Sequence, residues 1–339
     1  MQTPHSSPTI GSTPCFVWWP NAHRAYYLLV ALIAGLAFVL MWEGARHLPS
    51  QAGDVRVQVD HRFGPVIGVL VAFLIATGNW VVRQAAKDWS RVSAPGFDRT
   101  ALTAATFAPG WRSSLLCSLT GMLMGGFQLW VTGDLALLSR GSPLSLVATM
   151  ALVIVFWVLA VQVAGIFLIL IRGFYRLGLE VEPDLLRMER LAPFSYIGLR
   201  ILAVNTTSMA ILVLMVGVSD VDLAGLSVPM GFTTLVSVPG FLLPQIGVRR
   251  SIRRRRRLML AQLDARLDQT GFPSPVALES DDSARRVANL ASLREQIAQA
   301  PDWPVSGIGW LRFGMLLLLP AASWAASWVA DKLIQSFVA

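Results

Sequence analysis

The segment that organises this chain is residues 249–303, which read RRSIRRRRRLMLAQLDARLDQTGFPSPVALESDDSARRVANLASLREQIAQAPDW. Arginine occupies seven of the first nine positions, and the segment ends at Trp303-Pro304. It is the only long polar segment in the chain. The apolar runs on both sides of it are long enough to cross a membrane as helices, since a span needs about 20 apolar residues.

Composition supports the same fold class. Of 339 residues, 54% are hydrophobic and 14% are charged, whereas a soluble domain carries about 25% charged residues. In lipid, only helices and closed barrels satisfy the backbone. Barrel strands alternate in segments of about ten residues, and the apolar runs here are continuous. The sequence therefore predicts an all-α, polytopic transmembrane bundle.

Seven apolar runs are candidate spans: 25–42, 63–82, 113–133, 144–171, 197–218, 228–248 and 310–330. We expect four parts: a cytoplasmic N-terminal tail (1–24), a six-span bundle (25–248), a cytoplasmic helical hairpin (249–304), and the seventh span with a short outer tail (305–339). The third and sixth runs are the least apolar, so whether they fully cross is left open.

The basic residues predict the orientation of the chain. Of the 28 lysines and arginines, 23 lie on one side of a seven-span arrangement, and residues 249–304 alone hold eleven. Loops rich in Lys and Arg stay in the cytoplasm. We therefore expect a multi-pass protein of a bacterial-type inner (plasma) membrane, with the N-terminus in the cytoplasm and the C-terminus outside.

Residues 249–304 have the pattern of an antiparallel helical hairpin. Two apolar faces repeat at helical spacing, and residues 271–283 break the helix between them with Gly, Pro, Ser and Asp. The faces are Ile252, Met259, Leu263 and Leu267 in the first arm and Val287, Leu290, Leu293 and Ile297 in the second. Each arm is short for a free-standing coiled coil. We therefore expect the hairpin to pack on a cytoplasmic partner protein or on a second copy in a homo-oligomer.

The arginine run is expected to fix the topology and to bind anionic lipid head groups, at about 1 kcal/mol for each residue near the surface. Its members are Arg249, Arg250, Arg253, Arg254, Arg255, Arg256 and Arg257. Nucleic acid is not the expected partner, because recognition of bases needs stacking aromatic residues, and the hairpin has only Phe272 and Trp303.

Uncharged polar residues and helix breakers lie within several spans. They are Gln128, Gln162, Asn205, Thr206, Thr207, Pro239 and Gly240. The interpretation that we favour is hydrogen bonding between helices, at about 0.6 kcal/mol per bond on average. The alternative is a polar path beside a broken sixth helix. No acid is centred in a span, and Arg200 is expected to extend from its helix end to the membrane surface.

Two local patterns add detail. Gly64 and Gly68, and likewise Gly121 and Gly125, have the spacing that permits close helix packing. Pro183 suits the first turn of a helix, which predicts a short helix on the membrane surface before Pro193. A solvated connector is the alternative at that position.

Catalytic and cofactor motifs of the common types are absent from the sequence, including GxxxxGK, HExxH, CxxC and GxSxG. We therefore expect no catalytic, cofactor-binding or metal-binding residues. The leading hypothesis is a scaffold, signalling or oligomerising protein that acts through its cytoplasmic hairpin. The alternative is a channel or transporter with a polar path along the fifth and sixth spans. A membrane enzyme acting on lipid is a third hypothesis, for which the cytoplasmic acids are too scattered to assign roles.

Overall fold

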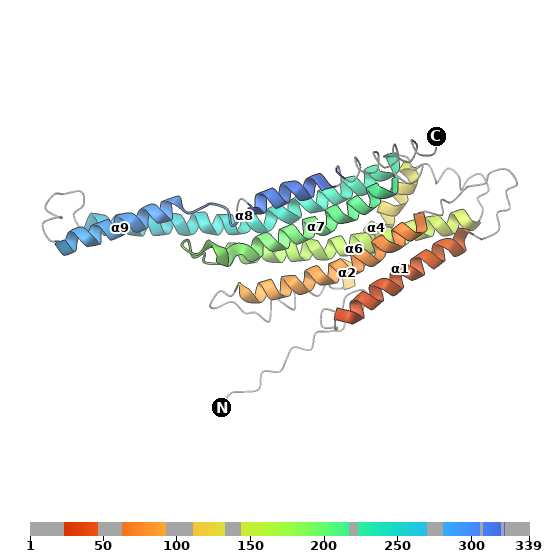
Figure 1. The fold of residues 1–339 in the computed structure, drawn as a ribbon, viewed down its shortest axis with the longest axis horizontal. Helices are drawn as coiled ribbons and strands as arrows, with labels where there is room; N and C mark the ends of the chain where they lie inside the picture. Colours follow the sequence, from red (N-terminus) through yellow and green to blue (C-terminus); the bar gives the residue numbers. More distant parts are fainter. Residues whose placement is uncertain are drawn as a thin grey trace, which may run out of the picture.

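A computed structural model describes residues 24–46, 63–92, 111–132, 144–216, 223–269, 281–305 and 308–319, together with Ala322. Within these residues every regular element is a helix. The helices are α1 (Arg24–Arg46), α2 (Phe63–Arg91), α4 (Trp111–Val131), α6 (Leu144–Glu180), the 3-10 helix η1 (Met188–Leu191), α7 (Ala192–Val216), α8 (Leu223–Gln269) and α9 (Asp281–Gln299). Figure 1 shows them lying lengthwise as an elongated bundle.

Six of these helices are long and apolar enough to cross a membrane, so the chain is a multi-span helical membrane protein. They coincide with the first six predicted spans. The seventh begins as a short apolar helix, Ile308–Leu319, and the rest of that predicted span lies outside the described residues. So does the predicted N-terminal tail, apart from Arg24.

The core of the bundle lies between α2, α6, α7 and α8. Large side chains there are fully buried, among them Phe167, Phe174, Phe194 and Ile201. Helices α1 and α4 lie at the edge of the bundle, with many apolar side chains exposed. A helix that is apolar all round is typical of a membrane span, so these faces are suited to lipid.

Glycines allow the helices to approach closely. A Cβ added at Gly121 would lie 2.5 Å from the Cα of Val158, and one added at Gly247 would lie 2.5 Å from the carbonyl oxygen of Tyr175. Gly68 likewise faces the backbone of α1 at Gly35. The predicted role of the spaced glycines in helix packing is confirmed.

The structure decides two questions that the sequence left open: the alternative of a polar path beside a broken sixth helix, and the short helix after Pro183. The sixth span is not broken, because α8 continues for 47 residues through Pro229, Pro239 and Pro244; neighbouring helices compensate for proline within membrane spans. The segment after Pro183 forms a turn, in which the Leu186 amide donates to Asp184 Oδ1 at 3.1 Å, followed only by η1. A backbone amide that is bonded to an aspartate side chain in this way competes with helix formation.

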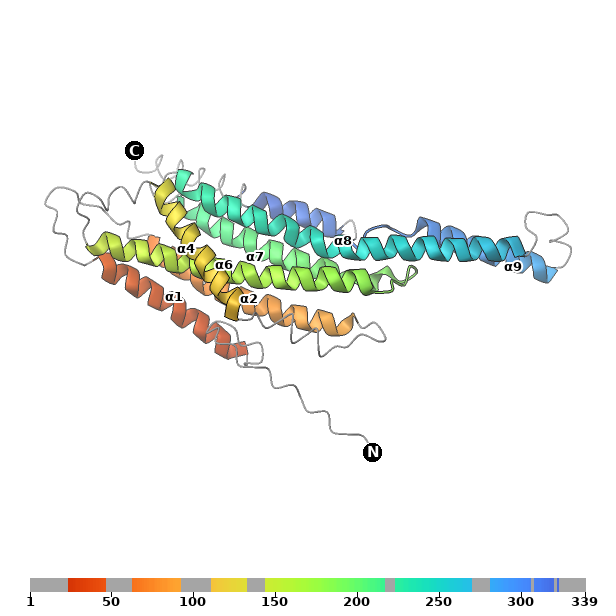
Figure 2. The same cartoon turned by 180° about the vertical axis from the view of Figure 1, so that it is seen from behind.

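Helix α8 extends well past the bundle, and α9 returns along it (Figures 1 and 2). The paired residues run in opposite order, since Asp264 meets Arg294 and Arg256 meets Ala300. The two helices therefore form an antiparallel hairpin that projects from one end of the bundle.

Candidate functional site

The apolar faces predicted for the hairpin form the contact between its arms. Ile252, Leu263, Leu267, Val287 and Ile297 are buried. Met259, Leu290 and Leu293 are partly buried against the same core. We call this contact the seam. It is a single line of side chains, because each helix of an isolated pair has only one neighbour. The polar interactions at the base of the hairpin consequently matter for its position.

Asp302 ties the returning chain to α8. Its carboxylate accepts hydrogen bonds from Arg253, at 3.2 Å from Nε and 2.9 Å from Nη2, and from Arg256 Nη1 at 2.6 Å. The hydrogen bond from Arg253 is the largest influence that lowers the pKa of Asp302 below its ordinary 3.8, and the charge of Arg256 acts in the same direction. Arg256 also donates to the carbonyl oxygen of Ala300. We call Arg253, Arg256 and Asp302 the clamp.

Aromatic contacts extend this attachment toward the bundle. The guanidinium of Arg249 lies over the ring of Trp303, 4.2 Å from its centroid, which is a cation–π arrangement. Trp303 in turn packs edge-on against Trp310, and Trp310 against Phe241 of α8. The chain that leaves α9 is therefore held against α8 on both sides of Pro304.

The end of α6 is fastened to α8 at the same level. The last carbonyls of a helix lack intrahelical partners. Ser251 Oγ donates to the carbonyl oxygens of Gly178 and Leu179, at 2.7 and 3.0 Å. Arg250 Nη1 donates to the Tyr175 hydroxyl at 2.7 Å. Where α8 leaves the bundle, it therefore contacts α6 on one side and the chain after α9 on the other.

The arginine run is divided by these contacts. Arg249, Arg253 and Arg256 face the returning chain, and Arg250 contacts α6. No hydrogen bond or ion pair to any described residue is found for Arg254, Arg255 and Arg257. From the sequence, all seven arginines were expected to bind lipid and to fix the topology. In the structure, four of them contact other residues of the protein.

A buried ion pair connects α2 and α7, and the sequence did not predict it. Arg200 Nη1 donates to Asp88 Oδ2, and the side chain of Asp88 is 1% exposed. Arg200 also lies against the rings of Trp80 and Tyr196, at 5.8 and 5.9 Å from their centroids. The sequence suggested only the membrane surface as a partner for Arg200, whereas in the structure Arg200 pairs with a carboxylate on the neighbouring helix.

Asp88 was missed because the second span was predicted to end at residue 82. Helix α2 continues to Arg91, and Val81, Ala85 and Trp89 are buried one turn apart. This four-residue spacing is visible in the sequence, and it places Asp88 on the buried side of the helix. The helical period beyond the apolar run was therefore the signal that would have identified it.

The residues of the predicted polar path lie in separate places. Gln128 accepts a hydrogen bond from Trp157, and Gln162 donates to Ser118 at 3.0 Å; both bonds join α4 to α6. Thr206 bonds within its own helix, at 2.9 Å to Leu202. Thr207 lies half-buried on α7.

Pro239 and Gly240 lie within continuous α8, and Gly240 faces Ile201. Of the seven residues, only Asn205 lines the cavity between α2, α6, α7 and α8.

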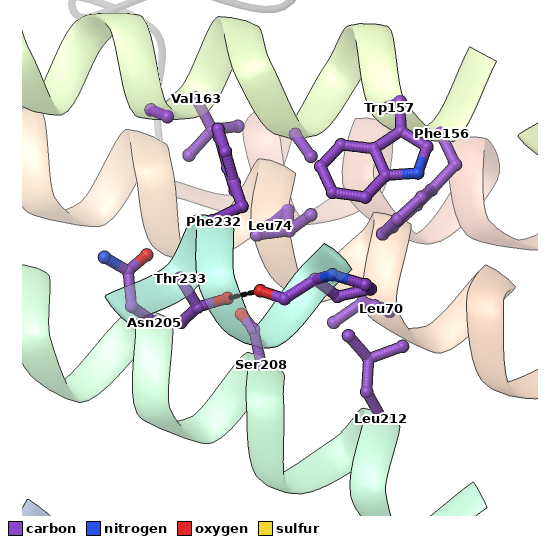
Figure 3. Close-up of a pocket in the computed structure, with 13 residues that line it drawn as sticks. Leu70, Leu74, Phe156, Trp157, Val163, Asn205, Ser208, Leu212, Phe232 and Thr233 are labelled. Atoms are coloured by element: carbon purple, nitrogen blue, oxygen red, sulfur yellow. Dashed lines mark hydrogen bonds between the residues drawn. The ribbon is translucent and has the colours of Figure 1, made fainter. Parts of the chain in front are cut away.

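That cavity has a volume of about 40 Å³. Figure 3 shows Asn205, Ser208 and Thr233 on one side of it, facing apolar and aromatic side chains that include Trp157 and Phe232. Thr233 donates to the carbonyl oxygen of Pro229 at 2.7 Å. Because a water needs about 10–15 Å³, the cavity has room for only a few, and it is mostly apolar.

Among the residues that the structure describes, no three His, Cys, Asp or Glu side chains are grouped as metal ligands. No family model, curated protein or solved structure matches the chain. The hairpin and its clamp are therefore the features of this chain from which a function is inferred.

Proposed function

We propose that this protein is an inner-membrane scaffold that presents the α8–α9 hairpin to proteins in the cytoplasm. The excess of Lys and Arg at the hairpin end supports the orientation. The continuity of α8 is the observation that carries the proposal. One 47-residue helix forms a membrane span and then the first arm of the hairpin, so any contact on the hairpin is rigidly connected to the bundle.

The clamp supports the same proposal. It holds the chain after α9 against α8, so the hairpin has a defined position relative to the membrane. A connector without a role in binding would need neither a buried seam nor a charged attachment at its base. Anionic head groups contribute to anchoring at Arg249 and Arg250, which lie nearest to the membrane.

Transport receives less support. The polar residues of the spans are divided between two helix pairs, and the cavity beside Asn205 has room for only a few waters. Neither feature makes a continuous polar path across the bundle.

Deletion of the hairpin tests the proposal. Residues 258–298 are replaced by a short linker, which leaves the clamp residues in the chain. Replacement of residues 271–279 by a linker of equal length is the control, because it keeps both arms. We expect normal insertion of both variants. The first should lose partner capture or change its oligomeric mass in detergent, measured by light scattering. If insertion is normal and both properties equal those of the wild type, the proposal is contradicted.

A further inference from the structure

One face of α8 carries a basic and apolar stripe in which only Arg250 has a side-chain hydrogen bond to a described residue, the Tyr175 hydroxyl. Arg250, Arg254, Arg257, Leu258 and Ala261 are separated by three or four residues or are adjacent, and all five are exposed. Side chains at these separations share one face of a helix. Leu258 is 53% exposed and is the only large apolar side chain exposed in the described part of the hairpin. We call these five residues the stripe.

Apart from Arg250, which donates to Tyr175 of α6, the stripe is separate from the contacts that hold the hairpin. The seam and the clamp use Ile252, Arg253 and Arg256 on other positions of the same helix. Within the described residues, Arg254 and Arg257 make no hydrogen bond or ion pair. The folded chain therefore leaves two cations and one leucine available side by side.

The stripe lies too far along α8 for lipid to explain it. A span takes about 20 residues, so counting from residue 228, where the sixth span is predicted to begin, the hydrocarbon ends at about Gly247. Leu258 is eleven residues further on, or about 16 Å along the helix axis at 1.5 Å per residue. The head-group layer is only about 5–8 Å thick. Leu258 consequently lies beyond it.

The charges also indicate that the partner of the stripe is a different protein, and not a second copy of this chain or a nucleic acid. Two copies in one membrane would place identical arginines at the same level, where like charges repel. The stripe has no aromatic residue on which a base would stack. Arginine around an apolar centre is a composition typical of protein interfaces, and an amphipathic helix supplies matching apolar and acidic positions.

We propose that the stripe is the docking surface for an acidic amphipathic helix of a cytoplasmic protein. This inference rests on the proposed function. It specifies which surface of the hairpin binds the partner and which chemical groups the partner presents. Leu258 receives an apolar side chain of the partner, and Arg254 and Arg257 pair with its carboxylates. Arg250, closest to the bundle, marks the end of the surface.

The test uses the full-length protein in nanodiscs of zwitterionic lipid. The probe is a fluorescent amphipathic peptide with leucines on one face and glutamates beside them, and binding is read as anisotropy. Leu258→Gln and the double variant Arg254→Glu/Arg257→Glu remove the stripe without touching the seam. Arg286→Glu, at an exposed arginine of α9, is the matched control for charge. The same peptide with lysines in place of glutamates is the control for sign.

We expect both stripe variants to weaken peptide binding about tenfold or more, while Arg286→Glu changes it by less than about twofold. Equal binding by wild type and stripe variants would overturn the inference, and the hairpin deletion would still decide the proposed function independently. Displacement of the peptide by phosphatidylglycerol vesicles or by a single-stranded RNA at lower concentration than by unlabelled peptide would also overturn it.

Discussion

Two arginine–aspartate groups lie in opposite surroundings in this protein. Asp88 pairs with Arg200 inside the bundle, with side chains 1% and 20% exposed. Asp302 pairs with Arg253 and Arg256 at the base of the hairpin, where the carboxylate is 30% exposed and Arg253 is 46% exposed. The chemistry is the same, and the access of water differs.

Because water reaches the carboxylate of one group and not that of the other, the two groups have different roles. Removing one partner of a buried pair leaves a charge without compensation, which is strongly destabilising. An exposed pair is screened by water and contributes little to stability. The buried pair therefore secures the packing of α2 against α7, whereas the clamp mainly determines where the hairpin lies.

The largest effect is expected for Asp88→Ala. The substitution leaves the largely buried Arg200, 20% exposed, without its carboxylate, and we expect a loss of about 3–5 kcal/mol in the free energy of unfolding. Unfolding in SDS, followed by circular dichroism, measures it. The double variant Asp88→Leu/Arg200→Met should recover most of the loss. A loss of less than about 1 kcal/mol for Asp88→Ala would remove the distinction between the two groups.

The next largest loss of stability is expected from a change in the packing between α6 and α8. Gly247→Ala places a Cβ 2.5 Å from the Tyr175 carbonyl oxygen, so we expect destabilisation by about 1–3 kcal/mol. Gly231 lies on the same helix with nothing within 4 Å of its added Cβ. Gly231→Ala should therefore be neutral or slightly stabilising, because alanine favours the helix by about 1 kcal/mol. The same SDS titration compares them, and equal losses would contradict the close approach.

For Asp302→Ala we expect a change of about 1 kcal/mol or less in stability and a clear change in hairpin position. Spin labels at Ala288 of α9 and Arg172 of α6, in a background without Cys15 and Cys117, report the distance by pulsed electron resonance. The distribution should broaden in Asp302→Ala and stay narrow in Arg257→Ala. An unchanged distribution in Asp302→Ala would show that the seam alone positions α9.

The smallest expected effect is that of pH. Pairing with Arg253 and Arg256 lowers the pKa of Asp302, because the cations favour its charged form. The contribution of the clamp is therefore fully present above the ordinary pKa of 3.8 and is lost as the pH falls through the lowered value. The same label pair should give one distribution from about pH 7 to about pH 4, and broaden only below that. Broadening near pH 6 would contradict this assignment.

The sequence was sufficient for the first six spans and for the two arms of the hairpin, because long apolar runs and helical spacing are local patterns. It predicted the buried faces around Leu263 and Ile297 correctly. Contacts between distant residues were not available from it. Asp88 and Arg200 are 112 positions apart, and the division of the arginine run depends on where Asp302 returns. The turn at Asp184 reflects a side-chain bond that outweighed helix propensity.

The claim that α8 is one rigid helix from bundle to hairpin is tested most directly by a distance. Spin labels at Ala265 in the hairpin half of α8 and at Arg172 on α6 are measured in nanodiscs. A continuous helix fastened through Ser251 and Gly247 predicts a single narrow distribution. A broad or two-peaked distribution would mean that α8 bends near Pro244, and it would contradict the proposal that the hairpin is presented at a fixed position.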